Sequence, residues 1–136
     1  MKSKIIFFDQ KMAITTETGI VFRYYDDLMY ILFDKPYCSL YFTGNVRYMA
    51  EVPLQYIMDN LPKTTFMICK RSAVLNICYC RELKKSTRMV EMEDGTEINL
   101  SKRNMLNFKW MIDNLSCISS HRPNCTDDEF KNHMVS

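Results

Sequence analysis

The chain has 136 residues, 47% hydrophobic and 25% charged, which fits one globular domain and excludes a wholly disordered protein. Its formal net charge is +2 at pH 7, and no run of 18 apolar residues occurs, which argues against a membrane-spanning helix. The apolar stretch near the N-terminus is too short for a signal peptide, so a cytoplasmic location is expected.

The first half of the chain has the pattern of an antiparallel β-meander. Residues 1–9 are expected to form an N-terminal arm or strand. Apolar runs between turn residues predict further strands over 12–16, 20–24, 28–33, 37–43 and 46–52. Between the first two of these runs, Gly19 is expected to supply a positive φ. Residues 54–61 then place apolar side chains on one face of a short helix, which follows Pro53 and stops at Pro62.

The second half continues with strands and closes with a longer helix. Strands are predicted over 66–69 and 75–80, a polar loop over 82–88, and a hairpin over 89–100 in which Asp94-Gly95 favours a type I′ turn. From Lys102, apolar residues at 105, 108, 112 and 115, flanked by Met111, predict a helix. Residues 116–136 are polar and are expected to form a tail. The predicted fold is mainly β, with antiparallel strands in small packed sheets, one short mid-chain helix and one C-terminal helix.

Two short basic segments interrupt this apolar framework. Lys70, Arg71 and Ser72 stand between two apolar runs, and cations are almost never fully buried, so a turn that exposes them is expected. In Ser101-Lys102-Arg103, the serine suits a helix N-cap, but cations in a first helical turn are disfavoured by the helix dipole. Backbone N–H groups and two cations would suit an anion such as phosphate. The structural alternatives are a solvated basic pair at 102–103 and an Arg71 that pairs with a local acid.

The sequence offers little for a metal, a cofactor or catalysis. The six cysteines lie mostly in apolar context and are interpreted as buried reduced thiols. Cys117, His121 and Cys125 have helical spacing, but Pro123 breaks such a helix, so no metal site is expected. Because enzyme motifs are missing and both histidines lie in the tail, no enzyme activity, cofactor or small-molecule substrate is predicted.

The order of these pieces resembles the LytTR-type DNA-binding domain of bacterial transcription regulators. The resemblance covers roughly residues 10–115 and is carried by YDDLMYI at 25–31, PLQYIMDNLPKTTFMICKRSAVLN at 53–76 and EDGTEINLSKRN at 93–104. The positions that match the family pattern are Phe66, Arg71, Ser72, Asn76, Ser101 and Arg103. The sequence departs from that pattern at Ile68, where the family commonly has Arg, and at Lys70, where it commonly has His.

The resemblance implies an elongated, mostly β fold whose loops enter successive major grooves. It makes Lys70, Arg71 and Arg103 the main expected DNA contacts. Lys35 and Tyr37 are weaker candidates in a third loop, and Ser72 and Lys102 complete the predicted set. The expected function is sequence-specific binding of double-stranded promoter DNA by a bacterial transcription regulator, with a homodimer on tandem sites and no membrane partner. The alternative is a β-rich protein-interaction module of the same fold that has lost tight DNA binding and meets an acidic partner.

Overall fold

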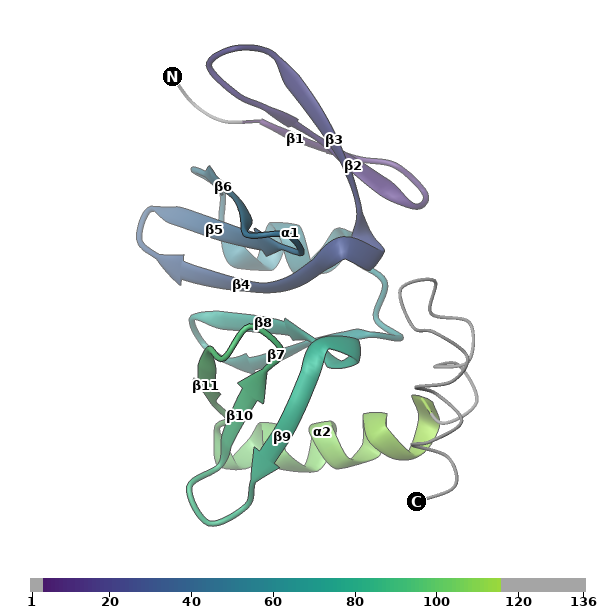
Figure 1. Ribbon diagram of the computed structural model, residues 1–136, viewed down its shortest axis with the longest axis vertical. Helices are drawn as coiled ribbons and strands as arrows, with labels where there is room; N and C mark the ends of the chain where they lie inside the picture. The colour runs from purple at the N-terminus through teal and green to yellow at the C-terminus, as the bar shows by residue number, and fades with distance from the viewer. Residues whose placement is uncertain (1–3, 116–136) are drawn as a thin grey trace.

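A computed structural model of the chain describes residues 4–115, which form three antiparallel sheets and two α-helices (Figure 1). The first sheet has the order β1-β2-β3, the second β6-β5-β4-β8-β7 and the third β11-β10-β9. The strands are β1 (Ile5–Phe7), β2 (Lys11–Thr15), β3 (Ile20–Tyr24), β4 (Leu28–Asp34), β5 (Tyr37–Phe42), β6 (Val46–Ala50), β7 (Phe66–Lys70), β8 (Ala73–Asn76), β9 (Cys80–Lys84), β10 (Met89–Met92) and β11 (Glu97–Asn99). The helices are α1 (Leu54–Asn60) and α2 (Lys102–Leu115), and two short 3-10 helices, Tyr25–Asp27 and Ile77–Tyr79, each precede a strand.

The central five-stranded sheet has other elements packed on both of its faces, and this makes it the scaffold of the molecule. One face packs on α1 and the first sheet in a core that contains Ile31 and Val74. The other face packs on the third sheet and α2 in a core that contains Leu75 and Phe108. Neighbouring residues of β8 therefore enter different cores, as alternation along a strand requires. Figure 1 shows the resulting stack, with the first sheet at one end and α2 at the other.

The predicted fold class is confirmed: antiparallel strands dominate, with a short mid-chain helix and a longer one near the end of the described residues. Among the side chains that the structure describes, the faces of the helices follow the predicted spacing with one exception. In α2, Phe108 and Met111 are buried, but Ile112 is 49% exposed. The prediction that Ile112 belongs to the buried stripe is therefore wrong, and the buried face of α2 is narrower than its apolar residues suggest.

Other local predictions are corrected in the second half of the chain. Residues 82–84, expected in a polar loop, belong to β9, which pairs with β10. The strand expected over 75–80 ends at Asn76, because a 3-10 helix follows it. Cys78 therefore lies in that helix, and Cys80 begins β9.

Two predicted turns also differ in their backbone conformation. Gly19 has no positive φ, whereas Gly44 (φ 77°), Asn45 (φ 61°) and Gly95 (φ 92°) do. The type I′ prediction for Asp94-Gly95 is wrong because Asp94 lacks the positive φ that this turn requires at both central residues. Instead, the N–H of Gly95 donates to the carbonyl of Met92 at 2.9 Å.

The cysteine prediction holds in part for the described residues. Cys38 and Cys69 are buried, Cys78 and Cys80 are half-buried, and all four are free thiols. The predicted tail at 116–136, with Cys117, His121 and Cys125, lies outside the described residues. Neither helix within residues 4–115 is long and apolar enough to cross a membrane.

Candidate nucleic-acid interface

The first basic segment forms the tight turn between β7 and β8. Lys70 ends β7, Arg71 and Ser72 make the turn, and Ala73 begins β8. The strand register shifts between Ile68 and Lys70, so an irregularity lies directly before the turn. Arg71 is exposed, whereas Lys70 and Ser72 are half-buried. The prediction of an exposed basic turn is confirmed for Arg71.

The second basic segment begins α2. The side-chain Oγ of Ser101 accepts hydrogen bonds from the backbone N–H of Asn104 at 3.3 Å and from its side-chain amide at 2.9 Å. These contacts confirm Ser101 as the N-cap, because it satisfies a donor that the helix itself leaves unpaired. Lys102 and Arg103 follow in the first turn and are both exposed. Two cations therefore stand at the helix end that favours anions.

The third segment is the turn between β4 and β5. Asp34 pairs with Tyr37 across the turn, and the Lys35-Pro36 peptide bond between them is cis. Lys35 is exposed, and Tyr37 is 42% exposed. This turn thus carries one acid, one cation and an accessible phenol.

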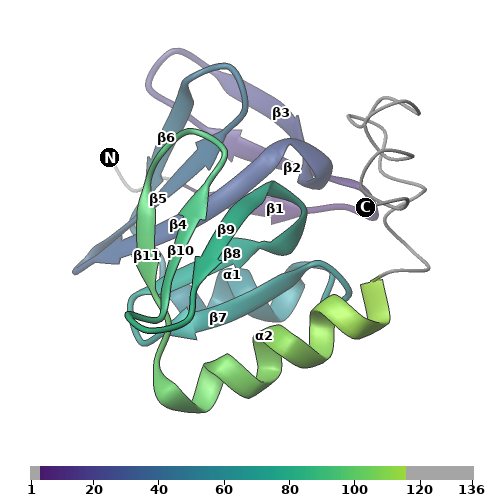
Figure 2. The same ribbon diagram turned by 60° about the horizontal axis from the view of Figure 1, so that its bottom comes forward.

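Two backbone hydrogen bonds join these three segments into one surface. The N–H of Phe33, next to the β4–β5 turn, donates to the carbonyl of Ser72 at 2.8 Å. The N–H of Ser101 donates to the carbonyl of Cys69 at 2.9 Å. The β7–β8 turn is therefore held between the other two segments, and all three lie on the left side of the molecule in Figures 1 and 2. We call residues 34–37, 70–72 and 101–103 the basic loops.

The cations of the basic loops take no part in the ion pairs of residues 4–115. Those ion pairs are Arg81 with Glu91 at 3.3 Å and Lys84 with Glu97 at 2.8 Å, both in the third sheet. The alternative in which a local acid neutralises Arg71 thus finds no support in this part of the chain. The cations on the three loops are Lys35, Lys70, Arg71, Lys102 and Arg103. Asp34 is their one acid, so the surface suits a polyanion.

Three positions compared above with the LytTR pattern contribute to the packing of the fold and do not belong to the basic loops. Phe66 is 2% exposed, and Ile68 packs against the core shared with α1. Asn76 is 3% exposed; its amide donates to the carbonyl of Leu28 at 3.0 Å, and its Oδ1 accepts from the N–H of Cys78 at 3.0 Å. Asn76 thus ties β8 to the start of β4 and begins the 3-10 helix.

A polar contact missed by the sequence analysis holds the third sheet to the central sheet. The hydroxyl of Tyr30 donates to Asp94 at 2.7 Å and lies 2.8 Å from the Thr96 hydroxyl. Burial raises the pKa of Tyr30 to about 12. Burial alone would raise the pKa of Asp94, but hydrogen bonds from Tyr30 and Thr96 lower it overall. Local sequence could not reveal this contact, because 64 positions separate Tyr30 from Asp94.

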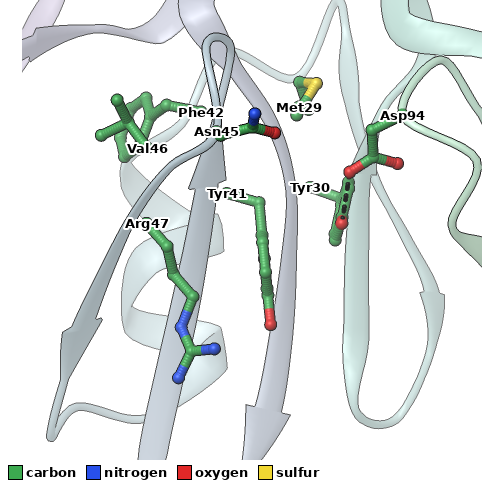
Figure 3. A pocket seen from close by; sticks show the side chains of 8 residues that line it. All are labelled: Met29, Tyr30, Tyr41, Phe42, Asn45, Val46, Arg47 and Asp94. Carbon is green, nitrogen blue, oxygen red and sulfur yellow. Dashed lines mark hydrogen bonds between the residues drawn. The ribbon is translucent and has the colours of Figure 1, made fainter.

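A cleft of about 240 Å³ opens beside this contact (Figure 3). The Tyr30 and Tyr41 rings stack with their centroids 4.6 Å apart, and the Arg47 guanidinium lies 5.7 Å from the Tyr41 centroid. The remaining lining residues are Met29, Phe42, Asn45, Val46 and Asp94. The cleft is lined by Met29 and Tyr30 from the start of β4, whereas residues 34–37 lie at the other end of that strand. The cleft is therefore separate from the basic loops.

Known proteins share both a sequence profile and the fold of this chain. The sequence profile of the LytTr DNA-binding domain matches residues 18–113. Among solved structures, the chain is similar to a LytTr DNA-binding domain from Bacillus cereus, described as part of a methyl-accepting/DNA response regulator. The TM-score is 0.67 at 18% identity, over 77% of this chain and 98% of the other. That likeness shows the shared fold, and a comparison with curated proteins found no match. The profile match spans well over half of the sequence, so the chain belongs to the LytTr DNA-binding domain family.

Proposed function

We propose that this chain binds double-stranded promoter DNA in a sequence-specific manner and acts as a transcription regulator in the bacterial cytoplasm. Membership of a DNA-binding domain family supports DNA as the partner. The observation that carries the proposal further is the hydrogen-bonded arrangement of the three basic loops on one side of the central sheet. Loops fixed to a rigid scaffold can present side chains in a constant register to the grooves of a duplex.

The chemistry of the loop residues divides them into base readers and phosphate contacts. Arg71 and Arg103 carry planar guanidinium groups that can donate two hydrogen bonds to the O6 and N7 atoms of guanine in the major groove. Lys35, Lys70 and Lys102 supply point charges for phosphates, which position the protein without reading sequence. Ser72 and Tyr37 add hydroxyl donors, and the positive end of the α2 helix dipole favours a phosphate oxygen.

The same surface bears on the proposed partner and assembly. The basic loops occupy one side of the chain, so a single copy contacts a limited stretch of duplex. We propose that two copies bind tandem sites as a homodimer, which would lengthen the sequence that is read. The position of Ile68 favours a second candidate function, because an apolar side chain packed in the core replaces a common family arginine. In that case the basic loops meet an acidic protein instead of DNA.

Fluorescence anisotropy with a duplex selected from random DNA tests the proposal. Arg71→Ala and Arg103→Ala should each weaken specific binding by about 1–3 kcal/mol, whereas Lys102→Ala should weaken binding to all duplexes about equally. Lys109→Ala is the matched control, because it removes an exposed cation from α2 outside the basic loops.

Salt dependence separates the two candidate functions. Binding through several phosphates should weaken log-linearly with salt, with a slope of about −0.9 per phosphate contact. The DNA proposal fails if selection enriches no sequence and the double variant of Arg71 and Arg103 binds bulk DNA as the wild type does. That result would favour the acidic protein partner.

A further inference from the structure

The first sheet, β1–β3, presents large apolar side chains to solvent on the face opposite its core. The exposed residues are Ile6 (45%), Phe8 (49%), Ile20 (62%), Phe22 (52%) and Tyr24 (54%). The pattern along β3 is inverted from the usual one, because its exposed positions are Ile20, Phe22 and Tyr24. A half-buried antiparallel sheet normally turns polar residues outward.

Strand register places these five side chains on one continuous face. Ile6 lies opposite Ala13, and Ala13 lies opposite Phe22, so these residues share a face. Alternation adds Ile20 and Tyr24 to that face, and the Phe8 ring lies 6.4 Å from the Phe22 ring. We call these five residues the outer aromatic face. The other side of the sheet already buries Ile5, Met12 and Ile14 in the core.

We propose that the outer aromatic face is the interface through which two copies of this chain form a two-fold dimer. The inference rests on the proposed homodimer, to which it assigns a surface. It does not rest on the tandem arrangement of the sites, because a two-fold dimer holds its copies in opposite orientations. In a two-fold dimer the same patch meets itself, so the patch has to be self-complementary. An apolar face meets this condition without a matching set of charges.

The exposed area is sufficient for such an interface. A large side chain offers about 200 Å², and the five residues are each about half exposed, so each copy would bury about 500 Å². Two copies together bury about 1,000 Å², the lower limit for a specific interface. A patch of about 500 Å² is also near the upper end for a monomer and is often functional. The predicted dimer is therefore reversible and depends on concentration.

The charges at this face favour a second copy over an acidic partner or an anionic lipid surface. Lys11 is the cation among the strand residues that share the face, and its ammonium lies 5.2 Å from the Phe22 ring centroid and 5.9 Å from that of Tyr24. It is thus already placed on aromatic rings of its own chain. The exposed residues Asp9 and Glu17 lie in the two turns of the sheet, where they would oppose an anionic membrane.

The position of the face is compatible with DNA binding by both copies. The first sheet lies at one end of the molecule, whereas the β7–β8 turn and the start of α2 lie toward the other end (Figure 1). Dimerisation through the first sheet would therefore leave residues 70–72 and 101–103 of each copy uncovered.

Sedimentation equilibrium of the full chain over a range of micromolar concentrations tests the proposal. The wild type should show a monomer–dimer equilibrium, and Phe22→Thr combined with Tyr24→Thr should raise the dimer dissociation constant at least about tenfold. Threonine keeps the strand preference of these positions. Leu106→Gln is the matched control, because it removes a 73% exposed apolar side chain from α2 and should leave the dimer unchanged.

A second measurement keeps the test decisive should the double variant fold poorly. NMR spectra of the wild type should show concentration-dependent shifts confined to β1–β3. The proposal would be overturned by a wild type that stays monomeric, which is the result expected if another protein or a lipid covers the face. It would also be overturned by an unchanged dimer in the folded double variant, or by shifts outside β1–β3. The double variant should still bind a single DNA site, and Arg71→Ala should still dimerise, so failure of the dimer and failure of DNA binding are distinguishable.

Discussion

Replacement of Asn76 by Ala tests how the central sheet is fixed beneath the basic loops. This side chain is 3% exposed and makes two hydrogen bonds, one to the carbonyl of Leu28 and one from the N–H of Cys78. Truncation removes both hydrogen bonds, and a buried backbone group that loses its partner, such as the carbonyl of Leu28, costs about 1–3 kcal/mol. We therefore expect the free energy of unfolding to fall by about 3 kcal/mol. With an m-value of about 1–3 kcal/mol/M, the urea midpoint should fall by about 1–3 M.

Urea denaturation followed by circular dichroism measures this loss, and two further variants define its cause. Asn76→Leu fills a similar volume but makes neither hydrogen bond, so it should cost about as much as alanine. Asn107→Ala removes an exposed amide that donates to Asn104 on the surface of α2, and it should change stability by less than about 0.5 kcal/mol. A loss below about 1 kcal/mol for both Asn76 variants would refute the role given to its hydrogen bonds.

Two further predictions concern the contact between the central and third sheets and the cap of α2. The pKa of Asp94 in the folded state is below its ordinary value of 3.8. The ionised carboxylate therefore stabilises the fold at any pH above that ordinary pKa, and this stabilisation is lost as the pH falls through the lower, folded-state pKa. Asp94→Asn should therefore be less stable than the wild type near neutral pH and converge on it in acid; a pH-independent difference between their urea midpoints would contradict the contact with Tyr30. Ser101→Ala should lower the free energy of unfolding by about 1 kcal/mol and the melting temperature by about 3–5 °C, because Asn104 loses its capping partner. Ser101→Asp should retain most of that stability, and an equal loss in both variants would exclude a capping role.

Sequence periodicity was sufficient for much of the fold because most elements are amphipathic. The hairpin over β10 and β11 and the helix α1 were predicted with small errors at their ends. Strand β9 was not predicted because three of its five residues, Arg81, Glu82 and Lys84, are charged and exposed. Its half-buried residues, Cys80 and Leu83, are too few to give an apolar strand pattern. The 3-10 helix at 77–79 was missed because its apolar residues continue the pattern of β8.

The candidate site was predictable one segment at a time but not as a surface. Arg71 and the pair at 102–103 can be identified as candidates from the sequence, because cations are energetically unfavourable among apolar residues or at a helix N-terminus. Their association depends on hydrogen bonds from Phe33 to Ser72 and from Ser101 to Cys69, which join segments about 30 or more positions apart. Such contacts follow from tertiary packing, so periodicity cannot reveal them. The same reason explains why the apolar run at 5–8 gave no sign that Ile6 and Phe8 would face solvent.

Sequence enrichment from random duplexes, carried out in parallel with the wild type, Arg71→Ala and Arg103→Ala, tests the central claim most directly. If the basic loops read bases, the wild type selects a defined site. Each variant then loses the preference at a different base-pair position and keeps the others. If both variants select the wild-type site with unchanged preferences, or if the wild type selects no site, sequence reading by these loops is contradicted.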